Sequence, residues 1–227
     1  MSKIYYSNRV IYKITISGFL FAIAILVNFI CSKFFAFPIA SFLKFDFSLV
    51  VITVSTMIVG LRYSYLLILL LMLIGPSYGS LGYSYIGILG HFILAISQVI
   101  YITIFHIMNL CLNQKDYNKA SFVILKLSIS SLITIILMIL FNIFLFTPWY
   151  FKLFNQLPDL PATYNSMVIQ WDKFKGLFLN INNYFAGSLT IYLLFNFINL
   201  LINSIIIFII IKLNKNTNFI TYENHLI

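Results

Sequence analysis

The stretch Phe42-Leu-Lys-Phe-Asp-Phe-Ser48 places two charged residues, Lys44 and Asp46, two positions apart in a chain that is otherwise almost entirely apolar. One apolar helical segment ends before this stretch, and another begins at its far end. A charged side chain in an apolar medium is costly unless it faces water, protein or a ligand. Lys44 and Asp46 are therefore the first candidates for a binding site.

The composition predicts an integral membrane protein of the helical type. Of the 227 residues, 62% are hydrophobic and 8% are charged, whereas soluble domains carry roughly 25% charged residues. Several apolar runs approach the roughly 20 residues that a helix needs to cross a bilayer. The first run is not followed by a small-residue cleavage site, so we expect it to be retained as a helix.

We predict an all-α fold, a single membrane domain over residues 1–227 with six transmembrane helices. The predicted spans are 14–31, 47–59, 63–74, 85–111, 122–146 and 189–211. Hydropathy alone allows the second and third to be two short spans or one broken helix. One continuous helix would bury Arg62 in mid-membrane, so we favour two spans with Arg62 in a tight turn.

The basic residues predict that both termini lie in the cytoplasm, because inner segments of membrane proteins are enriched in Lys and Arg. On this topology the inner segments carry nine basic residues: Lys3, Arg9, Lys13, Arg62, Lys115, Lys119, Lys126, Lys212 and Lys215. The outer segments carry five: Lys33, Lys44, Lys152, Lys173 and Lys175. We therefore interpret the net charge of +9 as a topology signal, and we expect a lipid bilayer and no nucleic acid as partner.

The outer segment between the fifth and sixth spans, residues 147–188, is long and contains both tryptophans, Trp149 and Trp171. Long loops are often lids or binding loops. Aromatic residues also gather at membrane interfaces as anchors. The sequence leaves both interpretations open.

Asparagines mark one face of the last span. Asn196, Asn199 and Asn203 are spaced so that they lie within about 60° of one another. The fifth span adds Asn142, and the fourth adds His91, Ser97 and Gln98. Amides buried in lipid need partners on other helices, in water or on a ligand. They could join helices, or they could line a site for a polar solute beside aromatic residues that stack on a flat ring.

Patterns for catalysis or metal binding are poor. His91 and His106 lie 15 residues apart on one predicted helix, about 22 Å along its axis, which is too far to share a metal. We find no His-Glu-x-x-His, no paired Asp motif and no nucleotide-binding motif. We therefore expect no catalytic residue, no metal and no cofactor, and any active transport would draw its energy from another subunit.

Four motifs, in this order along the chain, resemble those of the substrate-binding S components of energy-coupling factor (ECF) vitamin transporters, most closely the riboflavin-specific type. Gly18-Phe-Leu-Phe-Ala22-Ile-Ala24 is similar to the small-residue face that docks on the coupling subunit. The stretch from Pro38 to Ser48 resembles the first loop with its Phe-Leu-Lys-x-Asp-x-Ser signature. Phe141-Asn-Ile-Phe-Leu-Phe-Thr-Pro-Trp-Tyr150 and Phe195-Asn-Phe-Ile-Asn199 resemble motifs of the fifth and sixth helices.

The resemblance implies a six-helix subunit that captures vitamin, with riboflavin as the expected ligand, from outside the cell membrane. Its partners would be the transmembrane coupling subunit and two ATP-hydrolysing subunits. Lys44, Asn142 and Asn196 match positions that bind ligand in that family. The expected docking residues are Gly18, Ala22 and Ala24, and the full set of candidate ligand-binding residues is Lys44, Asp46, His91, Asn142, Asn196 and Asn199.

Two departures keep other vitamins open. Asn199 stands where the riboflavin type usually has Lys, and His91 lies in Gly87-Ile-Leu-Gly-His-Phe92, where the family favours Gly-Glu-Leu-Ala-Asn-Phe. An S component for folate or thiamine remains an alternative. A membrane enzyme or an assembly factor that holds partner subunits is a more distant one.

Overall fold

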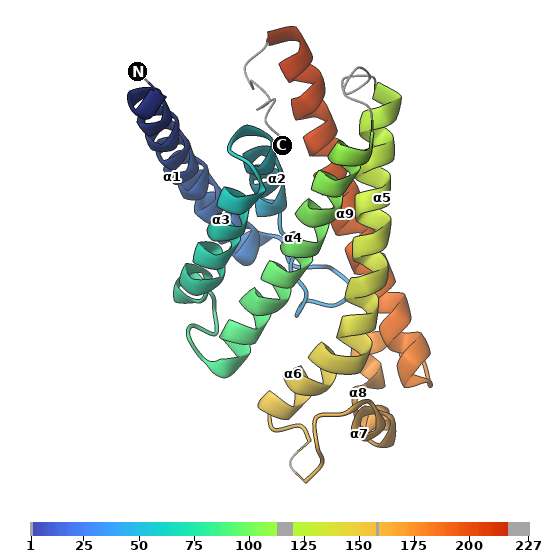
Figure 1. Ribbon diagram of the computed structural model, residues 1–227. Helices are drawn as coiled ribbons and strands as arrows, with labels where there is room; N and C mark the ends of the chain where they lie inside the picture. The colour runs from blue at the N-terminus through green and yellow to red at the C-terminus, as the bar shows by residue number, and fades with distance from the viewer. Residues whose placement is uncertain (1, 113–119, 158, 218–227) are drawn as a thin grey trace.

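The computed structural model describes residues 2–112, 120–157 and 159–217, and the named elements in this part of the chain are all helices (Figure 1). The longer helices are α1 (Ser2–Phe34), α2 (Ser48–Ile58), α3 (Leu61–Ile74), α4 (Tyr85–Cys111), α5 (Ala120–Phe141) and α9 (Tyr184–Thr217). The short ones are η1 (Gly75–Tyr78), η3 (Asn142–Phe146), α6 (Thr147–Leu153), α7 (Tyr164–Ile169), α8 (Trp171–Phe174) and η4 (Lys175–Phe178).

Five apolar helices among the described residues are long enough to cross a membrane: Val10–Phe34, Leu61–Tyr78, Tyr85–Cys111, Ala120–Leu153 and Tyr184–Asn214. The sixth apolar helix, α2, is shorter. The chain is thus an all-helical protein with the helices of a multi-pass membrane protein. Two of the basic residues used to predict its orientation, Lys115 and Lys119, lie outside the described residues.

Helices α2 and α3 are separate, and they are joined at Gly60. Gly60 has φ +96°, a conformation that glycine adopts without a steric penalty. Ser64 of α3 donates a hydrogen bond from its hydroxyl to Ser55 of α2 at 3.1 Å, which ties the two helices together. Arg62 is predicted to lie in the turn between the two helices. It lies instead in the first turn of α3, which begins at Leu61.

The fifth predicted helix does not end at Phe146, because a π-helical turn, η3, carries it on into α6. In this turn the Thr147 N–H donates to the carbonyl of Asn142, five residues back. The carbonyl of Ile143, which would accept that N–H in an α-helix, accepts the hydroxyl of Tyr184 instead. The turn leads into Pro148, which has no N–H to donate to an α-helical ladder. The predicted outer loop of residues 147–188 is therefore largely helical, and α9 begins at Tyr184.

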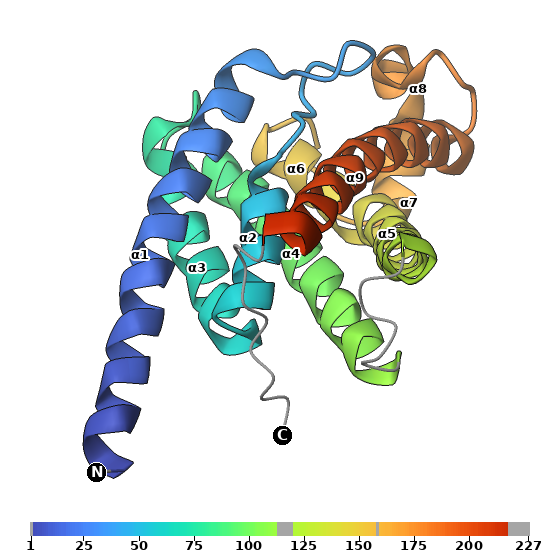
Figure 2. The same ribbon diagram turned by 90° about the horizontal axis from the view of Figure 1, so that it is seen from above.

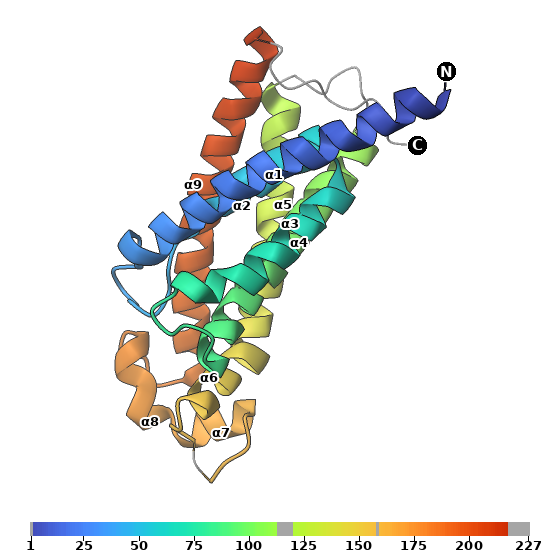
Figure 3. The same cartoon turned by 90° about the vertical axis from the view of Figure 1, so that its left-hand side faces the viewer.

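The two ends of the molecule differ in structure. The first turns of α1 and the last turns of α9 lie at one end, and α6, α7 and α8 lie at the opposite end (Figures 1 and 3). Helix α1 runs along one side of the bundle, while α2 is enclosed by other helices (Figure 2). Eight of the eleven α2 residues are buried, so α2 lies in the core. Of the residues 35–47 before it, Phe37, Ala40 and Asp46 are buried.

Candidate ligand-binding site

A cavity of about 410 Å³ lies where residues 35–47 meet α1, α4, η3, α6 and α9. This volume is within the range of roughly 300–1,000 Å³ that is typical of small-molecule sites. All six residues predicted to bind ligand line this cavity: Lys44, Asp46, His91, Asn142, Asn196 and Asn199. The fold therefore brings together side chains that lie far apart in the sequence.

The Asp46 carboxylate is 5% exposed and is held by four protein donors. Its Oδ1 accepts the Asn28 Nδ2–H at 2.9 Å and the Ser48 backbone N–H at 3.2 Å. Its Oδ2 accepts the Ser48 hydroxyl at 2.8 Å and the Gln98 Nε2–H at 3.0 Å. Because both oxygens are bonded within the protein, Asp46 holds the cavity wall together.

The backbone of Asp46 is fixed by the asparagines of α9. Its N–H donates to Asn199 Oδ1 at 3.2 Å, and its carbonyl accepts the Asn203 Nδ2–H at 2.9 Å. The predicted asparagine face is therefore divided: Asn203 joins structural elements, while Asn196 and Asn199 also line the cavity.

Sequence reasoning missed the role of Asn28. This residue lines the cavity from α1, donates to Asp46 and accepts the Tyr78 hydroxyl at 2.7 Å. A polar residue within the apolar span of α1 was the available signal, since such residues seldom face lipid. Gln98 carried the same signal in α4, where it lies seven residues, or about two turns, from His91.

Lys44 lies at the exposed side of the loop formed by residues 35–47. An isolated antiparallel bridge pairs it with Ala36, and its Nζ donates to the carbonyl of Ser32 at 2.7 Å. Within the described residues no ion pair joins Lys44 to Asp46. The ammonium group is therefore a donor at the cavity edge.

Asn142 and His91 both contribute polar side chains to the cavity for which the described residues provide no hydrogen bond. Asn142 is 8% exposed and lines the cavity, and its side-chain amide has no hydrogen-bond partner among the described residues. It is the first residue of η3, and π-turns occur frequently at functional sites. Asn196 lines the same cavity, and its Nδ2–H donates to the Tyr192 carbonyl at 2.8 Å.

Aromatic side chains form much of the remaining wall. Phe45 stacks on Phe195 with ring centroids 5.6 Å apart and an interplanar angle of 20°. Other aromatic residues that line the cavity are Phe42, Phe146, Tyr150, Phe151 and Tyr192. Such a wall can pack against a flat ring. Trp149, in contrast, is 40% exposed and lies outside the cavity lining.

The His91 ring packs against Gly75, in the space that the Cβ atom of any other residue at position 75 would occupy. A Cβ atom at Gly75 would lie 2.3 Å from His91 Nδ1, and the His91 ring also packs edge-on against Tyr78 with centroids 6.1 Å apart. The backbone of η1 therefore sets the position of the imidazole at the cavity.

We expect Gly75→Ala to destabilise the protein by roughly 1–3 kcal/mol, the usual range for forcing a methyl group into a packed site. In a His91→Ala background the same change should have almost no effect, because the obstructing ring is gone. Thermal unfolding of the four proteins in detergent measures this coupling. Gly90→Ala is the matched control, since its Cβ would meet nothing within 4 Å. Equal losses in both backgrounds would contradict the assigned contact.

The three predicted docking residues do not share one surface. Gly18 and Ala22 are exposed, four residues apart, on the outer side of α1. Ala24 is fully buried in the core, so it cannot contact a partner helix. A Cβ at Gly18 would meet nothing within 4 Å, so the backbone of α1 is open to close approach there.

The described residues contain no group of three or more His, Cys, Asp or Glu side chains that could hold a metal ion. Comparison with protein-family models and with curated proteins gives no match for this chain.

Proposed function

We propose that this chain is the substrate-capture S component of an ECF-type vitamin importer and that its ligand is riboflavin or a related flavin. The observation that carries the proposal is Asn142, an amide nine-tenths buried at an aromatic-lined cavity and without a protein partner among the described residues. Because Asn142 lines the cavity, a bound polar ligand could supply the hydrogen bonds that the described residues do not make to its amide.

In this proposal the bundle crosses the membrane six times. Helix α2 has eleven residues, which span about 16 Å and are too few to cross a bilayer alone. Residues 35–47 and α2 together would complete the second crossing. Both termini would be cytoplasmic, and the end that carries α6, α7 and α8 would face outward, so that vitamin enters from outside.

The chain would bind vitamin and perform no catalysis. ATP hydrolysis would belong to two partner subunits, and the exposed Gly18 and Ala22 would dock on the transmembrane coupling subunit through the close packing that small residues allow. Lys44, Asn142 and Asn196 would bond the polar edges of the ligand, and the aromatic wall would stack on its ring.

The first test is the absorbance spectrum of the protein purified in detergent from cells grown in rich medium, followed by titration with riboflavin. We expect bound flavin and quenching of flavin fluorescence. Asn142→Ala should weaken binding by roughly tenfold to a hundredfold, because a buried ligand group would lose its hydrogen bond. Asn182→Ala, at an exposed position outside the cavity, is the matched control and should bind normally.

A colourless protein that does not quench riboflavin would remove flavin from the proposal. The specific reason to test another vitamin is Asn199, whose Oδ1 already accepts the Asp46 N–H within the protein. Competition with folate and thiamine would then separate these ligands. A chain that co-purifies with membrane partners but binds no small molecule would instead be an assembly factor.

A further inference from the structure

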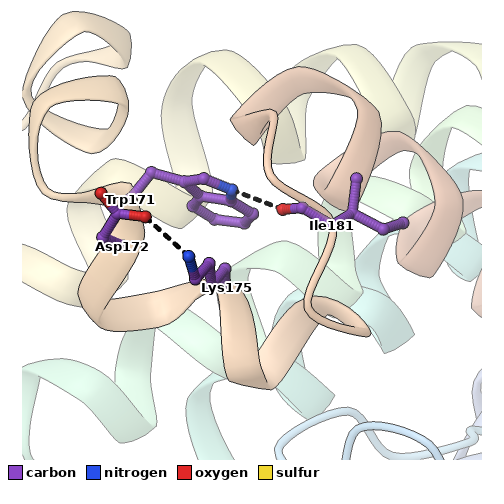
Figure 4. Close-up of polar contacts among 4 residues, drawn as sticks. All are labelled: Trp171, Asp172, Lys175 and Ile181. Atoms are coloured by element: carbon purple, nitrogen blue, oxygen red, sulfur yellow. Dashed lines mark hydrogen bonds and ion pairs between the residues drawn. The ribbon is translucent and has the colours of Figure 1, made fainter.

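Residues 159–183, called the cap, contain α7, α8 and η4 and connect α6 to α9. Trp171 anchors the cap: it is 3% exposed, and its Nε1–H donates to the Ile181 carbonyl at 2.7 Å. An exposed ion pair between Asp172 and Lys175, 2.8 Å long, lies beside it in the same turn (Figure 4). Hydrogen bonds within the cap therefore hold its short helices together.

The cap packs closely against α9 at Gly187, where the absence of a side chain leaves room for Trp171 and Phe178. A Cβ at Gly187 would lie 2.7 Å from Trp171 Cζ2 and 3.3 Å from Phe178 Cβ. Trp171 also packs on Tyr184 with ring centroids 5.1 Å apart. Because Tyr184 donates to the Ile143 carbonyl of η3, the cap rests on the residue that supports the π-turn.

Phe178 joins the cap to the cavity wall. It is fully buried, and its ring packs on Trp171 at 4.9 Å, Phe42 at 6.0 Å, Tyr192 at 6.2 Å and Phe151 at 6.4 Å between centroids. The last three residues line the cavity and come from the loop of residues 35–47, from α9 and from α6. Phe178 does not line the cavity itself, so it acts on a ligand through these rings.

The last part of the loop of residues 35–47 and its tip are held by different kinds of contact. Its last part is fixed by the hydrogen bonds of Asp46, whereas its tip turns through backbone bonds from Ala40 to Phe37 and from Leu43 to Ala40. Beyond this turn, aromatic packing attaches the tip: Phe37 contacts Phe195, and Phe42 contacts Phe178. Of these two contacts, the one through Phe42 is made with the cap.

We propose that Phe178 is a positioning residue that fastens the loop of residues 35–47 to the cap and so slows the release of ligand from the cavity. What the cavity binds rests on the proposed function, but the fastening of the loop does not. The cap thereby acquires a role in retaining the ligand, and its aromatic residues are more than interfacial anchors.

Hydrogen exchange in lipid nanodiscs tests the fastening without any ligand. In Phe178→Ala, the hydrogen-bonded amides at the tip of this loop, those of Phe37, Ala40 and Leu43, should exchange about tenfold faster, because one aromatic contact contributes on the order of a factor of ten. Phe178→Leu, which keeps a buried apolar side chain, should restore much of the protection. Leu177→Ala, in the same turn but half exposed, is the matched control.

Riboflavin dissociation, followed by recovery of its fluorescence, tests the consequence. Phe178→Ala should release riboflavin roughly tenfold faster than the Leu177→Ala control. Phe42→Ala should also speed the release, and in the double variant the rate should rise by less than the product of the two single effects, because each single change already removes the contact between Phe42 and Phe178. Gly187→Ala should act in the same direction by displacing Trp171.

Unchanged exchange in residues 35–47 of Phe178→Ala would overturn the proposal. So would an equal rise throughout α4 and α9, since that would indicate general destabilisation, and so would additive effects of Phe42→Ala and Phe178→Ala. If the unaltered protein binds no riboflavin, the flavin proposal fails, and the exchange experiment still decides the role of Phe178.

Discussion

Replacing Gly18 by Leu is expected to abolish vitamin uptake by the assembled transporter while leaving vitamin binding intact. Gly18 is exposed on the outer side of α1, and a Cβ atom there would meet nothing within 4 Å in the described residues. The variant should fold well, since Leu favours a helix by up to about 1 kcal/mol relative to Gly. The added bulk would prevent a partner helix from approaching closely.

Uptake of labelled riboflavin into proteoliposomes that contain the coupling and ATP-hydrolysing subunits measures the first effect, and fluorescence quenching by the isolated chain measures the second. Gly18→Ala is the matched control, because it keeps a small residue and should retain most of the uptake. Loss of both uptake and binding in Gly18→Leu would contradict the separation of docking from capture. Unimpaired uptake would place the docking surface elsewhere.

The second large effect is expected for Asp46→Ala, which should lower the free energy of unfolding by roughly 3 kcal/mol or more. The change removes the acceptor of the Asn28 amide and of the Ser48 hydroxyl and one of the two acceptors of the Gln98 amide. Each buried donor left without a partner costs about 1–3 kcal/mol. These amides belong to α1 and α4, so the loss would separate helices that form the cavity.

Thermal unfolding in detergent, followed by tryptophan fluorescence, measures this loss. Asp159→Ala removes the same charge from an exposed position of the cap and should unfold like the unaltered protein. Asp46→Asn should fall between the two, because it keeps one carbonyl acceptor. If Asp46→Ala is as stable as Asp159→Ala but binds no ligand, then Asp46 contacts the ligand and the wall does not depend on it.

The helical membrane fold follows from composition and the length of the apolar runs, because in lipid a helix satisfies its own backbone groups. The extent of the helices does not follow as easily. Pro148 predicts the end of a helix, but the helix continues past it through η3. There the carbonyl of Ile143 accepts the hydroxyl of Tyr184, which lies 41 residues after Ile143. Local sequence contains no signal for such a distant partner.

The sequence predicts which residues line the candidate site better than it predicts what each of them does there. Rare polar residues in apolar spans, such as Asn142 and Asn196, line the cavity as the hydrogen-bonding argument suggests. The division of roles depends on tertiary contacts: the Asp46 carboxylate is used within the protein, whereas the Asn142 amide is available. Likewise, the spacing of Gly18, Ala22 and Ala24 could not show that Ala24 lies in the core.

The hydrogen bonds between Asp46 and α9 have a consequence for how the protein is made. Asn199 and Asn203 lie in the last helix of the chain, and they fix a loop that belongs to its first quarter. During synthesis the first helices emerge long before α9 exists. The backbone of Asp46 therefore lacks its two α9 partners until then, and the cavity is completed only when the last helix has been made.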